Sequence, residues 1–109
     1  MPTTYKVLGQ SNPAATTNTD LYTVPAATST VVSTINICNT ANTGATFRVA
    51  VRPAGAAIAL KHYIAYDVTL AANDSIALTL GVTLATTDVI TVYSSSASVS
   101  FNAFGSEIA

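Results

Sequence analysis

The sequence predicts an all-β domain: an antiparallel β-sandwich, immunoglobulin-like or jelly-roll-like, with seven to eight strands. Short runs of β-branched and aromatic residues alternate with polar residues, as in half-buried strands. Clusters of Gly, Pro, Asn, Asp and Ser separate these runs at intervals of roughly 8–12 residues. No long segment has the 3.6-residue apolar period of a helix. The 109 residues are expected to form one domain, 1–109.

The N-terminal part of the chain is expected to contain two strands joined by a polar loop. Residues 5–10 are predicted to form the first strand. The following segment, 11–20, is rich in Asn, Thr and Ala and contains Pro13, which predicts a loop. A second, shorter strand at 21–24 ends at Pro25, because proline cannot donate to a ladder.

Residues 30–39 form the clearest predicted strand, and 47–52 the strand that follows it. In the first, strict alternation places Val31, Ser33, Ile35 and Ile37 on one face. The intervening loop, 40–44, ends in a glycine that can adopt positive φ. In the second strand the apolar residues Phe47, Val49 and Val51 point inward, so Arg48 and Arg52 point outward.

The second half of the chain is expected to supply four more strands. Residues 56–60 are ambiguous between a short helical turn and a loop. In strand 63–70, Ile64, Tyr66, Val68 and Leu70 alternate with Tyr63, Ala65, Asp67 and Thr69; Ile64 and Tyr66 are expected in the core, and Tyr63 and Asp67 are expected to face outward. A single long strand at 76–84 carries Gly81 as a bulge or bend. The last strands are 89–93 and 99–104.

The expected core and the expected contact segments follow from these elements. The tails 1–4 and 105–109 are predicted to contact or anchor partners, and Asp74 and Asp88 to cap turns. The side chains expected in the core are Ile35, Phe47, Val49, Ile64, Tyr66, Leu78, Leu80 and Phe101.

The composition favours a protein that packs against other proteins. Only 8% of the residues are charged, against a usual fraction of roughly 25%. A surface of Thr, Ser, Asn and Ala is easier to desolvate than one of Lys and Glu. An ordinary Thr-rich sandwich is the alternative. The net charge of −1 and the scattered cations predict no nucleic-acid partner, and no segment is long and apolar enough for a membrane partner. The first residues do not resemble a secretory signal.

Catalytic groups are scarce, and we expect no enzyme, no cofactor and no metal site. Cys38 is the only cysteine and lies within a strand, where a buried small hydrophobe is the favoured interpretation. His62 is the only histidine and is expected at the surface or at an interface. A Ser–His–Asp arrangement using His62 and Asp67 is conceivable, but no nucleophile-elbow motif selects a serine. The sequence therefore favours binding over catalysis.

The residues with the strongest tendency to form an interface are an outward-facing group around two strands. Arginine and tyrosine are enriched among residues that dominate binding energy. A solvated sheet face is the competing interpretation. The candidate interface residues are Arg48, Arg52, Lys61 and Tyr63.

Several segments together resemble small virion structural proteins of tailed bacteriophages, including those that infect cyanobacteria. The segments are 21–25 (LYTVP), 31–39 (VVSTINICN), 47–55 (FRVAVRPAG), 61–67 (KHYIAYD) and 101–107 (FNAFGSE). The resemblance extends from Tyr5 to Glu107 and implies a β-rich fold. It also implies location in the virion, after synthesis and assembly in the host cytoplasm. It assigns no functional residue.

Two positions in the particle are consistent with this resemblance. A capsid cement or decoration protein would bind the major capsid protein and stabilise the shell, as a homo-oligomer or in many symmetric copies. A tail, baseplate or fibre-attachment component would bind other virion proteins. The compact chain favours the cement role. A carbohydrate-binding adhesion module is a third possibility, and it would require two or more exposed aromatic residues forming a platform.

Overall fold

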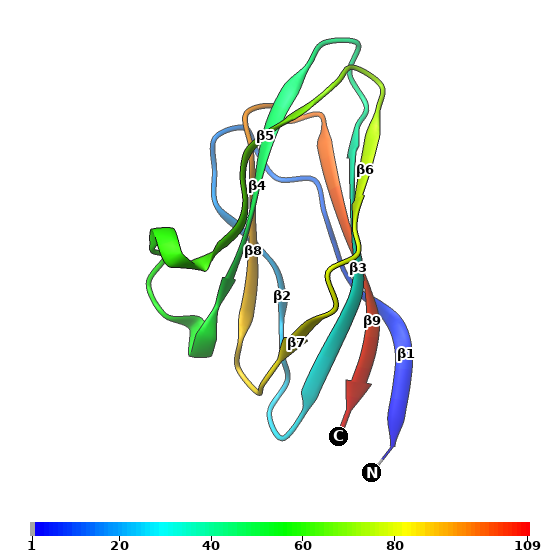
Figure 1. Cartoon of the computed structure of the whole chain (residues 1–109), viewed down its shortest axis with the longest axis vertical. Coiled ribbons are helices and arrows are strands. Elements are labelled where there is room, and N and C mark those ends of the chain that lie inside the picture. The colour runs from blue at the N-terminus through cyan, green and yellow to red at the C-terminus, as the bar shows by residue number, and fades with distance from the viewer. Residues whose placement is uncertain (1) are drawn as a thin grey trace.

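A computed structural model describes residues 2–109 and shows two antiparallel sheets packed face to face (Figure 1). The all-β sandwich predicted from the sequence is confirmed, with nine strands. One sheet has the strand order β1-β9-β3-β6, with β7 also paired to β3, and the other has the order β2-β8-β4-β5. In chain order the elements are β1 (Thr3–Ser11), β2 (Thr19–Thr23), β3 (Ser29–Asn39), β4 (Ala45–Arg52), the 3-10 turns η1 (Pro53–Gly55) and η2 (Leu60–His62), β5 (Tyr63–Leu70), β6 (Ser75–Leu78), β7 (Val82–Leu84), β8 (Val89–Ser94) and β9 (Val99–Ile108).

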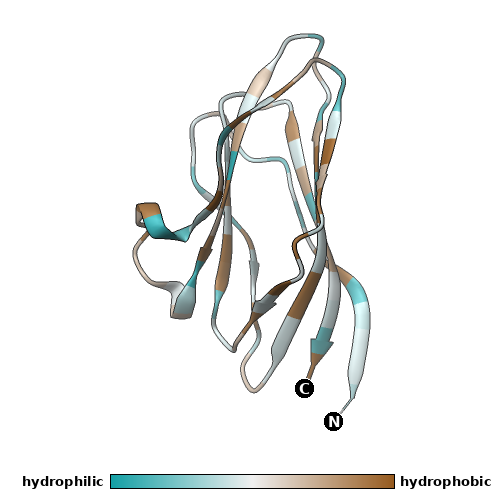
Figure 2. Ribbon diagram, viewed as in Figure 1, coloured by the Kyte–Doolittle hydropathy of each residue, from teal (hydrophilic) through white to brown (hydrophobic). Residues whose placement is uncertain are grey.

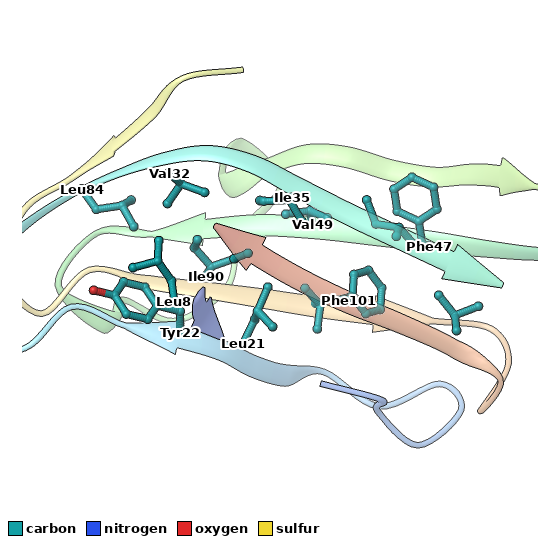
Figure 3. Packing of buried hydrophobic residues seen from close by; sticks show 14 of the residues in the cluster. Leu8, Leu21, Tyr22, Val32, Ile35, Phe47, Val49, Leu84, Ile90 and Phe101 are labelled. Carbon is teal, nitrogen blue, oxygen red and sulfur yellow. The ribbon is translucent and has the colours of Figure 1, made fainter. Parts of the chain in front are cut away.

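The core lies between the sheets and is formed by aliphatic side chains around two phenylalanines. Phe47 of β4 and Phe101 of β9 are fully buried and meet edge to face, with ring centroids 6.4 Å apart (Figure 3). Apolar residues occur along the strands of both sheets (Figure 2). Of the predicted core residues, Ile35, Phe47, Val49 and Phe101 are buried, and Leu78 packs against the core while partly exposed.

A bulge in β3 changes which of its side chains point inward. Val32 pairs with Gly105 and Thr34 with Phe104, so Ser33 is an extra residue in the ladder. Because a one-residue slip moves side chains to the opposite face, Val32 is buried and Val31 is exposed. The prediction that Val31 shares a face with Ile35 and Ile37 is therefore wrong.

Two further irregularities in β5 overturn the predicted faces of that strand. Phe47 pairs with Val68 and Val49 pairs with Ala65, which leaves Tyr66 and Asp67 opposite a single residue of β4. Asp67 accommodates the bulge with a φ of 50°. Ala65 consequently packs toward the core, whereas Ile64 and Tyr66 are 40% and 49% exposed. Their prediction as core residues is wrong.

The predicted long strand at 76–84 is two short strands. Gly81 has a φ of 65° and turns the chain between β6 and β7, both of which pair with β3. Leu80 lies at this break and is 57% exposed, so its assignment to the core is also wrong. This break accounts for the ninth strand.

The expected tails are parts of the sheet. Thr3 and Thr4 belong to β1, and β9 continues to Ile108. Thr3 pairs with Ile108, and the amide of Ala109 donates to the carbonyl of Pro2 over 3.1 Å. The two ends of the chain lie side by side at one end of the sandwich (Figure 1). Apart from Met1, which lies outside the described residues, the segments predicted to be contact tails are ordered by backbone pairing.

Candidate functional site

The outer face of the second sheet carries an arginine held between two tyrosine rings. Arg48 of β4 is opposite Tyr93 of β8, and its guanidinium carbon lies 4.2 Å from the centre of that ring. The β5 bulge brings Tyr66 to the other side, 4.3 Å from the same carbon. Both distances are within the range of favourable cation–π contacts. We call Arg48, Tyr63, Tyr66, Asp67 and Tyr93 the arginine–tyrosine cluster.

Asp67 fixes the orientation of the guanidinium. Nε of Arg48 donates to Oδ1 of Asp67 over 2.6 Å, and the second terminal nitrogen donates to Oδ2 over 3.2 Å. This two-point contact matches the fork of arginine to the carboxylate. The hydrogen bonds to Asp67 raise the pKa of Arg48 above its ordinary value, so the side chain remains charged.

The tyrosines of β5 form the rim of the cluster, where Tyr66 is exposed and Tyr63 is half-buried. The rings of Tyr63 and Tyr66 are 4.8 Å apart at an interplanar angle of 82°, an edge-to-face arrangement. Because the rings are nearly perpendicular, they do not form one flat stacking surface. Ala50 lies on the same outer face as Arg48, opposite Tyr63 and Thr91 in the ladder, and is fully buried there.

A second group of polar side chains surrounds Arg52 at the neighbouring end of β4. Its Nε donates to the hydroxyl of Thr91 over 2.9 Å, and a terminal nitrogen donates to Oδ1 of Asp20 over 3.0 Å. Its other terminal nitrogen donates to the carbonyls of Gly55 and Ala56 and so anchors the η1 turn. A shallow pocket of about 270 Å³ adjoins this group and is lined by Asn18, Asp20, Arg52, Ile58 and Thr91.

Lys61 and His62 lie in η2, immediately before β5. Lys61 is exposed and has no ion-pair partner within residues 2–109. His62 is buried, and its Nδ1 accepts a hydrogen bond from the amide of Ala59 over 3.0 Å. The expectation of a surface or interface histidine is therefore wrong, because the imidazole caps this turn.

The four predicted interface residues are thus divided between two settings. Arg48, Arg52 and Tyr63 are on the outer face of the second sheet, and Lys61 is in the turn beside it. Sequence reasoning missed Tyr66 and Tyr93. Tyr93 could have been found from its outward parity in 89–93, whereas Tyr66 faces outward only because of the β5 bulge.

The described residues do not assemble a recognisable catalytic or metal centre. Cys38 lies on β3 of the first sheet, whereas His62 precedes β5 of the second. Cys38 is half-buried, which corrects the expectation of a buried thiol. Within residues 2–109 no three His, Cys, Asp or Glu residues are grouped as they would be around a metal ion. No helix in that range has the length and apolar character needed to cross a bilayer.

The outer face of the first sheet presents a different, more apolar surface. A groove of about 370 Å³ runs between β1, β9 and β3. Tyr5, Val31 and Phe104 supply its apolar walls, and all three are exposed. Tyr5 is the most exposed of the large hydrophobic residues, at 84%.

Comparison with known proteins gave no match to a family model, to a curated protein or to a solved structure.

Proposed function

We propose that this protein is a structural component of a bacteriophage virion, and specifically a capsid cement protein that binds and stabilises the shell. The proposal combines the sequence resemblance stated above with the pre-ordered arginine–tyrosine cluster. The cluster is the single observation that supports binding most directly, because its side chains are held in place before any partner arrives.

The cluster has the properties of a protein-binding hot spot. Each flexible side chain that becomes ordered on binding loses conformational entropy, at a free-energy cost of about 0.5–1.5 kcal/mol. Here two rings and a carboxylate already restrain Arg48, so little further ordering is required. The half-exposed Tyr66 offers a large apolar area with a polar tip. Tyrosine and arginine are the residue types that most often dominate binding energies.

The remaining charges also favour lasting contact with another protein. Ion pairs within the chain occupy Lys6, Arg48 and Arg52, three of the four cations. Asp74 and Asp88 accept hydrogen bonds from backbone amides at turns, as predicted. When a partner covers a surface whose charged side chains are already paired, few unpaired charges have to be desolvated.

The test is co-sedimentation of the purified protein with empty capsids, followed by cryo-EM of the decorated particle. We expect saturable binding in hundreds of copies per particle, and Tyr66→Ala should weaken it about 30-fold, as expected for a hot spot worth about 2 kcal/mol. Leu80→Ala, an exposed change on the other sheet, is the matched control. Capsid binding that is absent, or unaffected by Tyr66→Ala, would contradict the proposal. Roughly a dozen copies per particle would indicate the tail or baseplate instead.

The arrangement of the tyrosines favours a protein partner over a sugar. A carbohydrate-binding face requires exposed rings that act as a common platform, but Tyr63 and Tyr66 stand at 82° to each other. We expect no hit on a glycan array. Binding to a defined glycan that is lost in Tyr66→Ala would support the adhesion module instead.

A further inference from the structure

The four edges of the two sheets are not equally protected against pairing with another strand. An edge strand exposes unpaired backbone groups, and proteins usually shorten, bend or charge such edges. In the first sheet, one edge consists of β6 and β7, which have only four and three residues and are separated by the turn at Gly81. In the second sheet, β5 contains two register shifts, and β2 has five residues with a shift after Asp20.

The remaining edge, β1, lacks most of these features. It has nine residues, and its ladder with β9 is regular from Thr3 to Val7 before the single shift. Its outer side has no strand partner within residues 2–109. Its one charged side chain, Lys6, contacts Oε1 of Glu107 over 3.3 Å, so the charge is directed back into its own sheet.

The side chains beside this edge are apolar and exposed. Tyr5 and Val7 face the same side of the sheet as their partners Ser106 and Phe104. Tyr5 lines the 370 Å³ groove with Val31 and Phe104 and is the most exposed of these three side chains, and Val7 on the same strand is also exposed. An added strand would therefore cover apolar area as well as satisfy backbone groups.

We propose that β1 pairs antiparallel with β1 of a second copy of this chain, about a two-fold axis that passes near Tyr5. The segment Thr3–Val7 is complementary to itself in this register. Tyr5 lies opposite Tyr5 of the second copy, Thr4 opposite Lys6, and Thr3 opposite Val7, so outward-facing residues meet outward-facing residues. The register shifted by two residues would place the two Lys6 residues opposite each other, which like-charge repulsion disfavours.

The first sheet of one copy and the first sheet of the other would then form one continuous sheet across the dimer. Five residues from each copy make a contact well below the roughly 800 Å² per partner of a standard interface. The dimer is therefore weak in dilute solution and strengthens where many copies are held close together. This surface is separate from the arginine–tyrosine cluster, so the inference does not depend on the capsid role.

Charge exchange at Tyr5 tests the two-fold axis directly. In sedimentation velocity over increasing concentration, we expect a reversible monomer–dimer equilibrium for the natural sequence. Tyr5→Lys and Tyr5→Glu should each weaken dimerisation at least tenfold, because like charges would meet across the axis. A 1:1 mixture of the two variants should restore the dimer. Leu60→Lys, at a side chain that is 81% exposed beside the other sheet, should dimerise like the natural sequence.

Cross-linking gives a second readout that does not require a strong dimer. In a Cys38→Ser background, Tyr5→Cys should form an intermolecular disulfide faster than Leu60→Cys, since residues directly opposite in antiparallel strands are within disulfide range. A monomer at every concentration with no preferential cross-link would overturn the proposal. A dimer that tolerates both charge variants, or that the mixture fails to restore, would overturn it as well. If Tyr66→Ala loses capsid binding but dimerises like the natural sequence, the result would support pairing through β1 as an interaction independent of the arginine–tyrosine cluster.

Discussion

Gly105 occupies a position in which even a methyl group would collide with the neighbouring backbone. It lies in β9, paired with Lys6 on one side and with Val32 on the other. A Cβ atom added there would lie 2.0 Å from the carbonyl oxygen of Val31 and 3.0 Å from its carbonyl carbon. Since contacts below about 3 Å are essentially never observed for Cβ atoms, β3 would have to move by about 1 Å at this point.

This displacement would disturb the centre of the first sheet. β3 and β9 are its two central strands, and ten residue pairs join them. The colliding atoms belong to the backbone, so a change of side-chain rotamer cannot relieve the contact. Overpacking usually costs about 1–3 kcal/mol where side chains can adjust. For Gly105→Ala we therefore expect at least about 3 kcal/mol, a large part of the 5–15 kcal/mol typical of a domain.

Urea unfolding monitored by far-UV circular dichroism measures this loss. The midpoint should fall at nearly constant m-value, and thermal unfolding should shift downward by on the order of 10 °C. Gly44→Ala is the matched control, because its added methyl would lie 3.7 Å from the carbonyl oxygen of Leu70, an ordinary contact distance. A Gly105→Ala protein within about 1 kcal/mol of the natural sequence would refute the close approach described here.

Three further predictions concern the core and the network between the sheets. Phe101→Ala should destabilise the fold by about 3–5 kcal/mol, whereas Leu80→Ala should change the free energy of unfolding by less than about 0.5 kcal/mol in the same urea experiment. The hydroxyl of Tyr22 donates to Glu107 over 2.5 Å; this hydrogen bond and, to a smaller extent, contact with Lys6 lower the pKa of Glu107. Glu107 therefore adds stability above pH 4.5 that is lost as pH falls through its lowered pKa, and Glu107→Gln should flatten the acid limb of the stability profile. Burial, together with the hydrogen bond to Glu107, raises the pKa of Tyr22 to about 12, so stability should decline as pH rises from 10 to 12. In an absorbance titration, Tyr22→Phe should lack the tyrosine ionisation step near pH 12.

Much of the fold was accessible from local patterns in the sequence. Alternation over 47–52 assigned Phe47 and Val49 to the core and Arg48 and Arg52 to the outer face. Asp88 was predicted to cap a turn, and its Oδ2 accepts from the amide of Ala85, three residues earlier in the chain. These predictions succeeded because a strand's side-chain period and a turn's preference for aspartate act over only a few residues.

The predicted side-chain faces that failed share one cause, which is that the strands are interrupted or bulged. Strict alternation assumed that each strand kept its register, but the bulges at Ser33 and at Asp67 moved neighbouring side chains to the other face, and the turn at Gly81 interrupted the predicted strand at 76–84. The sequence of a single strand does not show where two of its residues will lie opposite one residue of the neighbouring strand. Tyr66, predicted to be buried, is consequently 49% exposed within the arginine–tyrosine cluster.

The C-terminal segment shows how strongly partner strands decide a local structure. Residues 105–109 contain Gly, Ser and Glu and were expected to be a tail, yet β9 continues through Ile108. Strands on both sides, β1 and β3, supply the pairing that the segment's own propensity does not. Glu107 is held there by Lys6 and by Tyr22 of the opposite sheet.

By itself, the sequence determined the class of the fold, most of its strands and the scarcity of charge, since these depend on composition and short-range periodicity. The tertiary structure decided which faces those strands present. It brought Arg48, Tyr66 and Tyr93 together from three strands and left β1 as the long unprotected edge. The physical reason is that bulges, sheet order and edge position arise from pairing between segments distant in sequence, and no local pattern specifies that pairing.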